Sequence, residues 1–90
     1  MAAHARPELG QPDLLGLLAL DEAGFRRQFA GTPILRAKHG GLLRNVCVAL
    51  GNVGDAAALP ALERAAAGAE PLVVEHARWA MDRIRERGQG

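Results

Sequence analysis

The stretch ALGNVGDAAALPAL, residues 49–62, decides the fold, because it ends one helical pattern and begins another. In the pattern that ends within it, four apolar residues are spaced three or four apart, as on the buried face of a helix. These residues are Leu43, Val46, Leu50 and Val53. The helical period and the high content of alanine and leucine, both good helix formers, favour an all-α protein.

Within this stretch, residues 51–54 are predicted to form the turn, because Gly51 and Gly54 adopt positive φ at little cost. Asp55 follows, where its carboxylate would cap a helix over residues 56–67. Pro60 has no backbone N–H to donate, so the first turn of that helix should be bent or 3₁₀.

A second copy of the first pattern lies 31 residues downstream, in a helix that Pro71 opens. Offsetting the sequence by 31 places Val46 on Ala77 and Leu50 on Met81. The second helix should bury Val73, Ala77, Ala80 and Ile84. Helix pairs that repeat at this period are typical of α-solenoids, and residues 42–86 resemble HEAT-like repeats.

Two shorter helices are predicted before this region. Asp13 and Asp21 are suited to be their N-caps, and Phe25 lies on one face of the second helix. Thr32-Pro33 is a further helix start, and Gly40-Gly41 is predicted to interrupt that helix as a hinge.

The predicted fold is therefore all-α, a short HEAT-like α-solenoid of antiparallel helices preceded by an N-terminal helical pair. We expect residues 1–12 to be an N-terminal extension, residues 13–86 the helical domain and residues 87–90 a C-terminal tail.

The composition excludes several functions. The chain has no serine and no tyrosine, and its one cysteine, Cys47, can form no internal disulfide and no cysteine-only metal cage. We therefore expect no catalytic residue and no metal site. The longest apolar run is far shorter than the about 20 residues that cross a bilayer, and the first ten residues lack the apolar core of a signal peptide. These features predict a soluble, cytoplasmic protein with no membrane partner.

Charge is distributed unevenly along the chain. Residues 23–54 contain no carboxylate and five basic side chains. Such a stretch is either a solvated helix surface or a surface that meets phosphates. The candidate nucleic-acid-binding residues are Arg26, Arg27, Arg36, Lys38 and Arg44.

Residues 12–55, PDLLGLLALDEAGFRRQFAGTPILRAKHGGLLRNVCVALGNVGD, resemble the C-terminal region of the tRNA epoxyqueuosine reductase family. The family pattern has a PDL…LL.LD…F…F.G(S/T)P segment followed by an RN…ALGN.GD helix and turn. The closing segment PLVVEHARWAMDRI is similar to the last HEAT-like helix of the family, so the resemblance extends over residues 7–84.

The resemblance implies the reduction of epoxyqueuosine in tRNA by a protein that carries cobalamin and [4Fe–4S] clusters. Each such cluster needs four thiolates, so no cofactor of that kind is expected in this chain. The chain would then be a non-catalytic, tRNA-facing module, whether a fragment or one half of a split protein, that works with the missing catalytic domain. The alternative is a stand-alone HEAT-like adaptor that binds a partner protein.

Other residues are assigned more local roles. Arg44 is expected to contact either nucleic acid or a structural partner, Asn52 or Asp55. Asn45, Asn52 and Asp55 are expected to brace the turn. Cys47 is predicted to be buried and inert, and Trp79 to pack in the core or between repeats. Without a catalytic domain, the apolar face of the first helix should be exposed and favour weak self-association, through Leu14, Leu17 and Leu18.

Overall fold

The computed structural model describes residues 10–33 and 38–89, and every regular element within these residues is helical. This confirms the all-α prediction. In chain order the elements are α1 (Gln11–Leu18), α2 (Glu22–Phe29), α3 (Lys38–Val53), the 3₁₀ turn η2 (Ala56–Ala58), α4 (Leu59–Ala66) and α5 (Pro71–Gln89).

At the start of each of the first two helices, an aspartate carboxylate accepts a hydrogen bond from a free backbone N–H. Asp21 caps α2 as predicted, because its carboxylate accepts a 2.7 Å hydrogen bond from the Gly24 N–H. Asp13 is not the N-cap of α1, which contradicts the prediction. The N-cap is Gly10, and Asp13 lies one turn inside the helix, where its carboxylate accepts from the Gly10 N–H at 3.1 Å. A carboxylate in the first turn satisfies a free N–H group and complements the helix dipole.

Helix α3 is longer than predicted at both ends. It continues through Gly40 and Gly41, where a hinge was expected, and it includes residues 51–53, which were assigned to the turn. The turn is confined to Gly54 and Asp55, and the Gly54 N–H still donates to the Leu50 carbonyl at 2.7 Å. Glycine lowers helix propensity by only about 1 kcal/mol, so packing against α5 outweighs it here.

The 3₁₀ turn expected before Pro60 is present as η2. The predicted helix start at Thr32-Pro33 runs into residues 34–37, which lie outside the described part of the chain. Among the described residues, the Thr32 hydroxyl donates instead to the Phe29 carbonyl at the end of α2.

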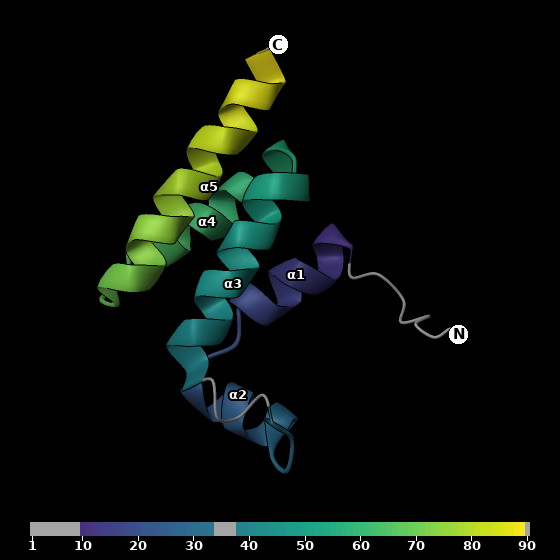
Figure 1. The fold of residues 1–90 in the computed structure, drawn as a ribbon, viewed down its shortest axis with the longest axis vertical. Coiled ribbons are helices and arrows are strands. Elements are labelled where there is room, and N and C mark those ends of the chain that lie inside the picture. Colours follow the sequence, from purple (N-terminus) through teal and green to yellow (C-terminus); the bar gives the residue numbers. More distant parts are fainter. Residues whose placement is uncertain (1–9, 34–37, 90) are drawn as a thin grey trace.

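Helices α3 and α5 lie side by side and run in the same direction (Figure 1). Glu70, just before α5, lies next to Gly40 in the first turn of α3, whereas Arg87 near the end of α5 reaches the last turn of α3. The chain returns between them through α4, which packs on α5 (Figure 1). Helix α1 crosses α3, and α2 lies beyond the start of α3.

The hydrophobic core lies where α1, α3, α4 and α5 meet. Val73, Ala77, Ala80 and Ile84 of α5 are all buried, as predicted. The buried cluster also contains Leu14, Leu18, Val46, Cys47, Leu50, Ala58, Leu62 and Met81.

Two expectations about exposure are wrong. Leu14 and Leu18 were expected to be exposed without a catalytic domain, but α1 folds onto α3 and leaves them 5% and 8% exposed. Val53 was placed on the buried face of α3, but it is 66% exposed, because it lies in the last turn of the helix, where the chain turns away.

Candidate functional site

The structure brings two of the predicted nucleic-acid-binding residues together. Arg26 of α2 and Lys38 at the start of α3 are both exposed, and they line one hollow of about 650 Å³. His39 lines the same hollow, together with the carboxylates of Glu22 and Glu70. The hollow therefore carries both signs of charge, with its cations on the α2 side and at the start of α3.

The other predicted cations do not line this hollow. Arg27 is exposed, and it lies about 100° from Arg26 around α2. Arg44 is half-buried farther along α3, and its Nε atom is buried without a hydrogen-bond partner. Neither Asn52 nor Asp55 supplies the partner that the sequence suggested. Arg36 lies outside the described residues.

His39 connects α2 to the rest of the molecule. Its Nε2 atom lies 2.7 Å from the Leu20 carbonyl oxygen, and because a carbonyl only accepts, this nitrogen carries the proton and donates. The Nδ1 atom lies 3.5 Å from a Glu22 carboxylate oxygen, and the ring packs 5.5 Å from that of Phe25. Phe25 in turn contacts Phe29, with ring centroids 5.4 Å apart. One side chain thus fixes the loop before α2, the first turn of α2 and its aromatic face.

The turn after α3 is fixed by a reciprocal pair of hydrogen bonds to the start of α1. The Gln11 amide donates to the Asp55 carboxylate at 2.8 Å, and the Asp55 N–H donates to the Gln11 side-chain oxygen at 2.8 Å. The same carboxylate caps η2 by accepting from the Ala57 N–H at 2.9 Å. The hydrogen bond from Gln11, and then that from Ala57, lower the pKa of Asp55 below its ordinary value.

Asn45 and Asn52, which were expected to brace the turn, are both exposed. The bracing group is Arg87. Its guanidinium donates two 2.6 Å hydrogen bonds, to the carbonyl oxygens of Gly51 and Gly54. These carbonyls belong to the end of α3, where the helix leaves acceptors unsatisfied and the helix dipole favours a cation. Arg87 therefore caps α3 from α5, although the sequence assigned it to a tail.

Trp79 and Cys47 pack at or near the contact between α3 and α5. The Trp79 indole lies against Gly51, where a Cβ atom would overlap the ring, and the Arg83 guanidinium lies 5.8 Å from the ring centroid. Trp79 remains 39% exposed, so it packs between helices and not in the core. Cys47 is fully buried as predicted, and this burial raises the pKa of its thiol to about 11.

The sequence contained only weak signals for Gln11, His39 and Arg87. A cation near the end of a neighbouring helix is a general capping signal. Arg83, Arg85 and Arg87 all fit this signal, so the sequence did not single out Arg87. Gln11 and His39 act on partners 44 and 19 residues away along the chain, which no local pattern specifies.

Comparison with known proteins gives one consistent result. The chain is 42% identical over 85 residues to epoxyqueuosine reductase of Shewanella oneidensis, and 44% identical over 79 residues to that of Xanthomonas campestris pv. campestris. It is 41% identical over 83 residues to epoxyqueuosine reductase of Escherichia coli. These matches cover 91%, 87% and 91% of the chain.

The chain is homologous to one segment of the epoxyqueuosine reductases. It spans only 22% of the length of each of these three relatives. No family model and no solved structure matched the chain.

The residues of this chain do not fit the iron–sulfur clusters that the resemblance associates with epoxyqueuosine reductases. A cluster needs several accessible thiolates, whereas Cys47 is alone and its thiol is held neutral by burial. In the part of the chain that the structure describes, no three His, Cys, Asp or Glu side chains are placed to hold a metal ion. Over the same residues, no helix combines the length and the hydropathy needed to cross a bilayer.

Proposed function

We propose that this chain is a non-catalytic, tRNA-facing module of an epoxyqueuosine reductase, and that it acts together with the part of that protein which it does not span. The observation that carries this proposal is the identity of 41–44% to three epoxyqueuosine reductases over about nine-tenths of the chain. Cobalamin, the iron–sulfur clusters and the reduction of the modified base belong, in this proposal, to the remaining part.

The proposal includes a HEAT-like arrangement of the helices. It is supported by the shared direction of α3 and α5, by the return of the chain through α4, and by the 31-residue offset between matching buried positions such as Val46 and Ala77. HEAT-like units bury their faces against neighbouring units and leave a long surface free for a partner.

The tRNA-facing surface in this proposal is the exposed part of α2 and the start of α3. Arg26 and Lys38 lie on the same hollow there, and Arg27 is exposed nearby in sequence. Cations of this kind bind phosphates without reading sequence, so the isolated chain should not discriminate strongly between tRNAs. Selectivity for the wobble base would come from the catalytic part.

The test is a titration of tRNA into the wild-type chain and an Arg26→Gln/Lys38→Gln variant at two salt concentrations. We expect the variant to bind more weakly, and the slope of log K against log salt to decrease by about 0.7–0.9 for each phosphate that the variant no longer neutralises. An Arg78→Gln/Arg85→Gln variant is the matched control, because it removes the same charge from exposed positions on α5.

The control variant should bind tRNA with the affinity and salt slope of the wild type, apart from a small effect of its altered net charge. If the wild-type chain binds tRNA with no salt dependence, or if both variants lose affinity equally, the tRNA-facing surface is not the one proposed. In that case the stand-alone adaptor that binds a partner protein becomes the better hypothesis.

A further inference from the structure

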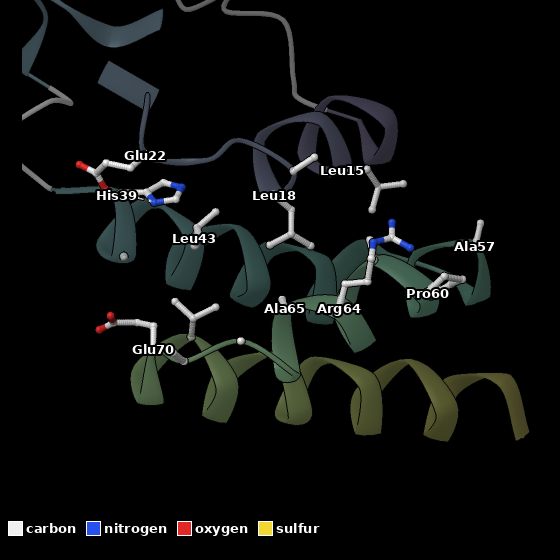
Figure 2. A pocket seen from close by; sticks show the side chains of 16 residues that line it. Leu15, Leu18, Glu22, His39, Leu43, Ala57, Pro60, Arg64, Ala65 and Glu70 are labelled. Carbon is white, nitrogen blue, oxygen red and sulfur yellow. Dashed lines mark ion pairs between the residues drawn. The ribbon is translucent and has the colours of Figure 1, made fainter. Parts of the chain in front are cut away.

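A second hollow, of about 620 Å³, lies between α1 and the layer formed by α3, α4 and the start of α5 (Figure 2). Its walls are mostly aliphatic. Leu15 and Leu18 point into it from α1, opposite side chains of α3 and α4 (Figure 2). The main apolar lining residues are Leu15, Leu18, Leu43, Ala61, Ala65 and Val73. We call this hollow the α1–α4 groove.

Charged side chains lie at separate places along the α1–α4 groove. Glu22, beside His39, and Glu70, on the opposite side, lie at one end, whereas Arg64 extends across the groove farther along, toward Leu15 of α1 (Figure 2). Among the described residues, neither Glu70 nor Arg64 takes part in an ion pair. The groove thus has an apolar centre, an acidic end and a basic side chain farther along.

We propose that the α1–α4 groove binds an amphipathic helical segment of protein, supplied by the part of the epoxyqueuosine reductase that this chain does not span. The apolar face of the segment would pack on Leu15, Leu18 and Leu43. A lysine or arginine of the segment would meet Glu70, since Glu22 already pairs with Arg26 and His39, and a carboxylate of the segment would meet Arg64. This inference rests on the proposed function in assuming that the chain works with that missing part.

Two observations favour a protein segment over nucleic acid. The carboxylates of Glu22 and Glu70 outnumber the one arginine of the groove, Arg64, whereas in the hollow beside α2 Arg26 and Lys38 balance the same two carboxylates. An aliphatic floor also offers a nucleic acid no hydrogen-bonding group. Helical segments, in contrast, bind grooves by placing apolar residues three and four apart into an apolar floor, and charges at the rim set their direction. Since the chain spans 22% of each of the three relatives compared, most of the polypeptide that could supply the segment lies outside it.

The experiment uses a synthetic 14-residue helical peptide that has three leucines on one face, an arginine at one end and a glutamate at the other. A matched peptide carries glutamine in place of both charged residues. Each peptide is titrated into the isotopically labelled chain, and backbone amide shifts report where and how tightly it binds. We expect shifts at the groove-lining residues. The charged peptide should bind about fivefold more tightly than the matched peptide, because it would form two additional exposed ion pairs.

Two variants at partly exposed or exposed positions test the groove itself. Ala61→Phe fills the apolar centre and should weaken both peptides by about tenfold or more. Glu70→Arg reverses the charge at the acidic end and should remove the preference for the charged peptide. The controls are Ala67→Phe and Glu75→Arg, which make the same changes at exposed positions that do not line the groove.

The proposal is overturned if neither peptide binds, if the peptides bind with equal affinity, or if the shifts lie outside the groove. It is also overturned if the groove amides shift with protein concentration alone, because the occupant is then a second copy of this chain. None of these readouts involves tRNA. Failure of the groove therefore leaves the tRNA titration as a separate test of the proposed function.

Discussion

The Asp55 carboxylate combines two local roles, since it caps η2 and holds Gln11 at the start of α1. Its pKa is lowered in the folded chain. The carboxylate therefore favours folding above the pKa that it has when unfolded, and this contribution is lost as the pH falls through the folded-state pKa. We expect the urea midpoint of the wild type to fall on acidification more steeply than that of Asp55→Asn, which keeps an acceptor oxygen but cannot titrate.

The matched control is Asp82→Asn, on an exposed position of α5, which should follow the wild-type profile. Parallel profiles for the wild type and Asp55→Asn would contradict the assignment of acid sensitivity to this carboxylate.

Cys47 provides the second prediction at the residue scale. Burial raises the pKa of its thiol to about 11, and the nucleophilic form is the thiolate, so a thiol reagent should label the native protein only as fast as the protein opens. Labelling should accelerate strongly in denaturant. Cys47→Ala should lower the free energy of unfolding by about 1 kcal/mol, because a small cavity replaces the sulfur atom. Fast labelling of the folded chain would show that the thiol is accessible.

At the scale of elements, Arg87 makes α5 the cap of α3. Arg87→Ala removes two charge-assisted hydrogen bonds to the carbonyls of Gly51 and Gly54. We expect a loss of about 1–3 kcal/mol in the free energy of unfolding, measured by denaturant titration. Arg83 is on the same helix, and its guanidinium lies over the Trp79 ring. Arg83→Ala should therefore lower the free energy of unfolding by less than Arg87→Ala does. An equal loss for both variants would mean that the cap contributes no more than ordinary surface packing.

The helices themselves were largely predictable, because local signals define them. Asp21, Pro60 and Pro71 act within one or two turns of their own positions, and the buried face of α5 follows a simple period. The errors came where packing overrides propensity. Gly40, Gly41 and Gly51 read as helix breakers, but α3 continues through all three, and Gly51 is needed where Trp79 lies against the backbone.

The candidate sites were less predictable for the same reason. The charge run identified Arg26 and Lys38, but not which of the basic residues would share a hollow, since that depends on how α2 meets α3. Nor did the apolar pattern of α1 show that Leu14 faces the core while Leu15 and Leu18 line the α1–α4 groove.

At the scale of the whole molecule, α2 has few contacts with the other helices, and in the described part of the chain His39 of α3 contacts both α2 and the loop before it. Removing this side chain in His39→Ala should loosen α2 while leaving the core intact. We expect amide hydrogen exchange in α2 to become about fivefold faster, as the loss of one hydrogen bond worth about 1 kcal/mol implies, with little change in α5. His76→Ala on α5 is the control. Unchanged exchange in α2 would show that other interactions hold it.

The packing of Trp79 on Gly51 also provides an optical probe. The chain has one tryptophan and no tyrosine, so its intrinsic fluorescence comes almost entirely from an indole placed where α3 meets α5. Trp79 lines neither the hollow beside α2 nor the α1–α4 groove. Its emission should therefore change when the two longest helices separate and should not change when a ligand binds at either hollow. Folding and binding can then be followed independently in one unlabelled sample.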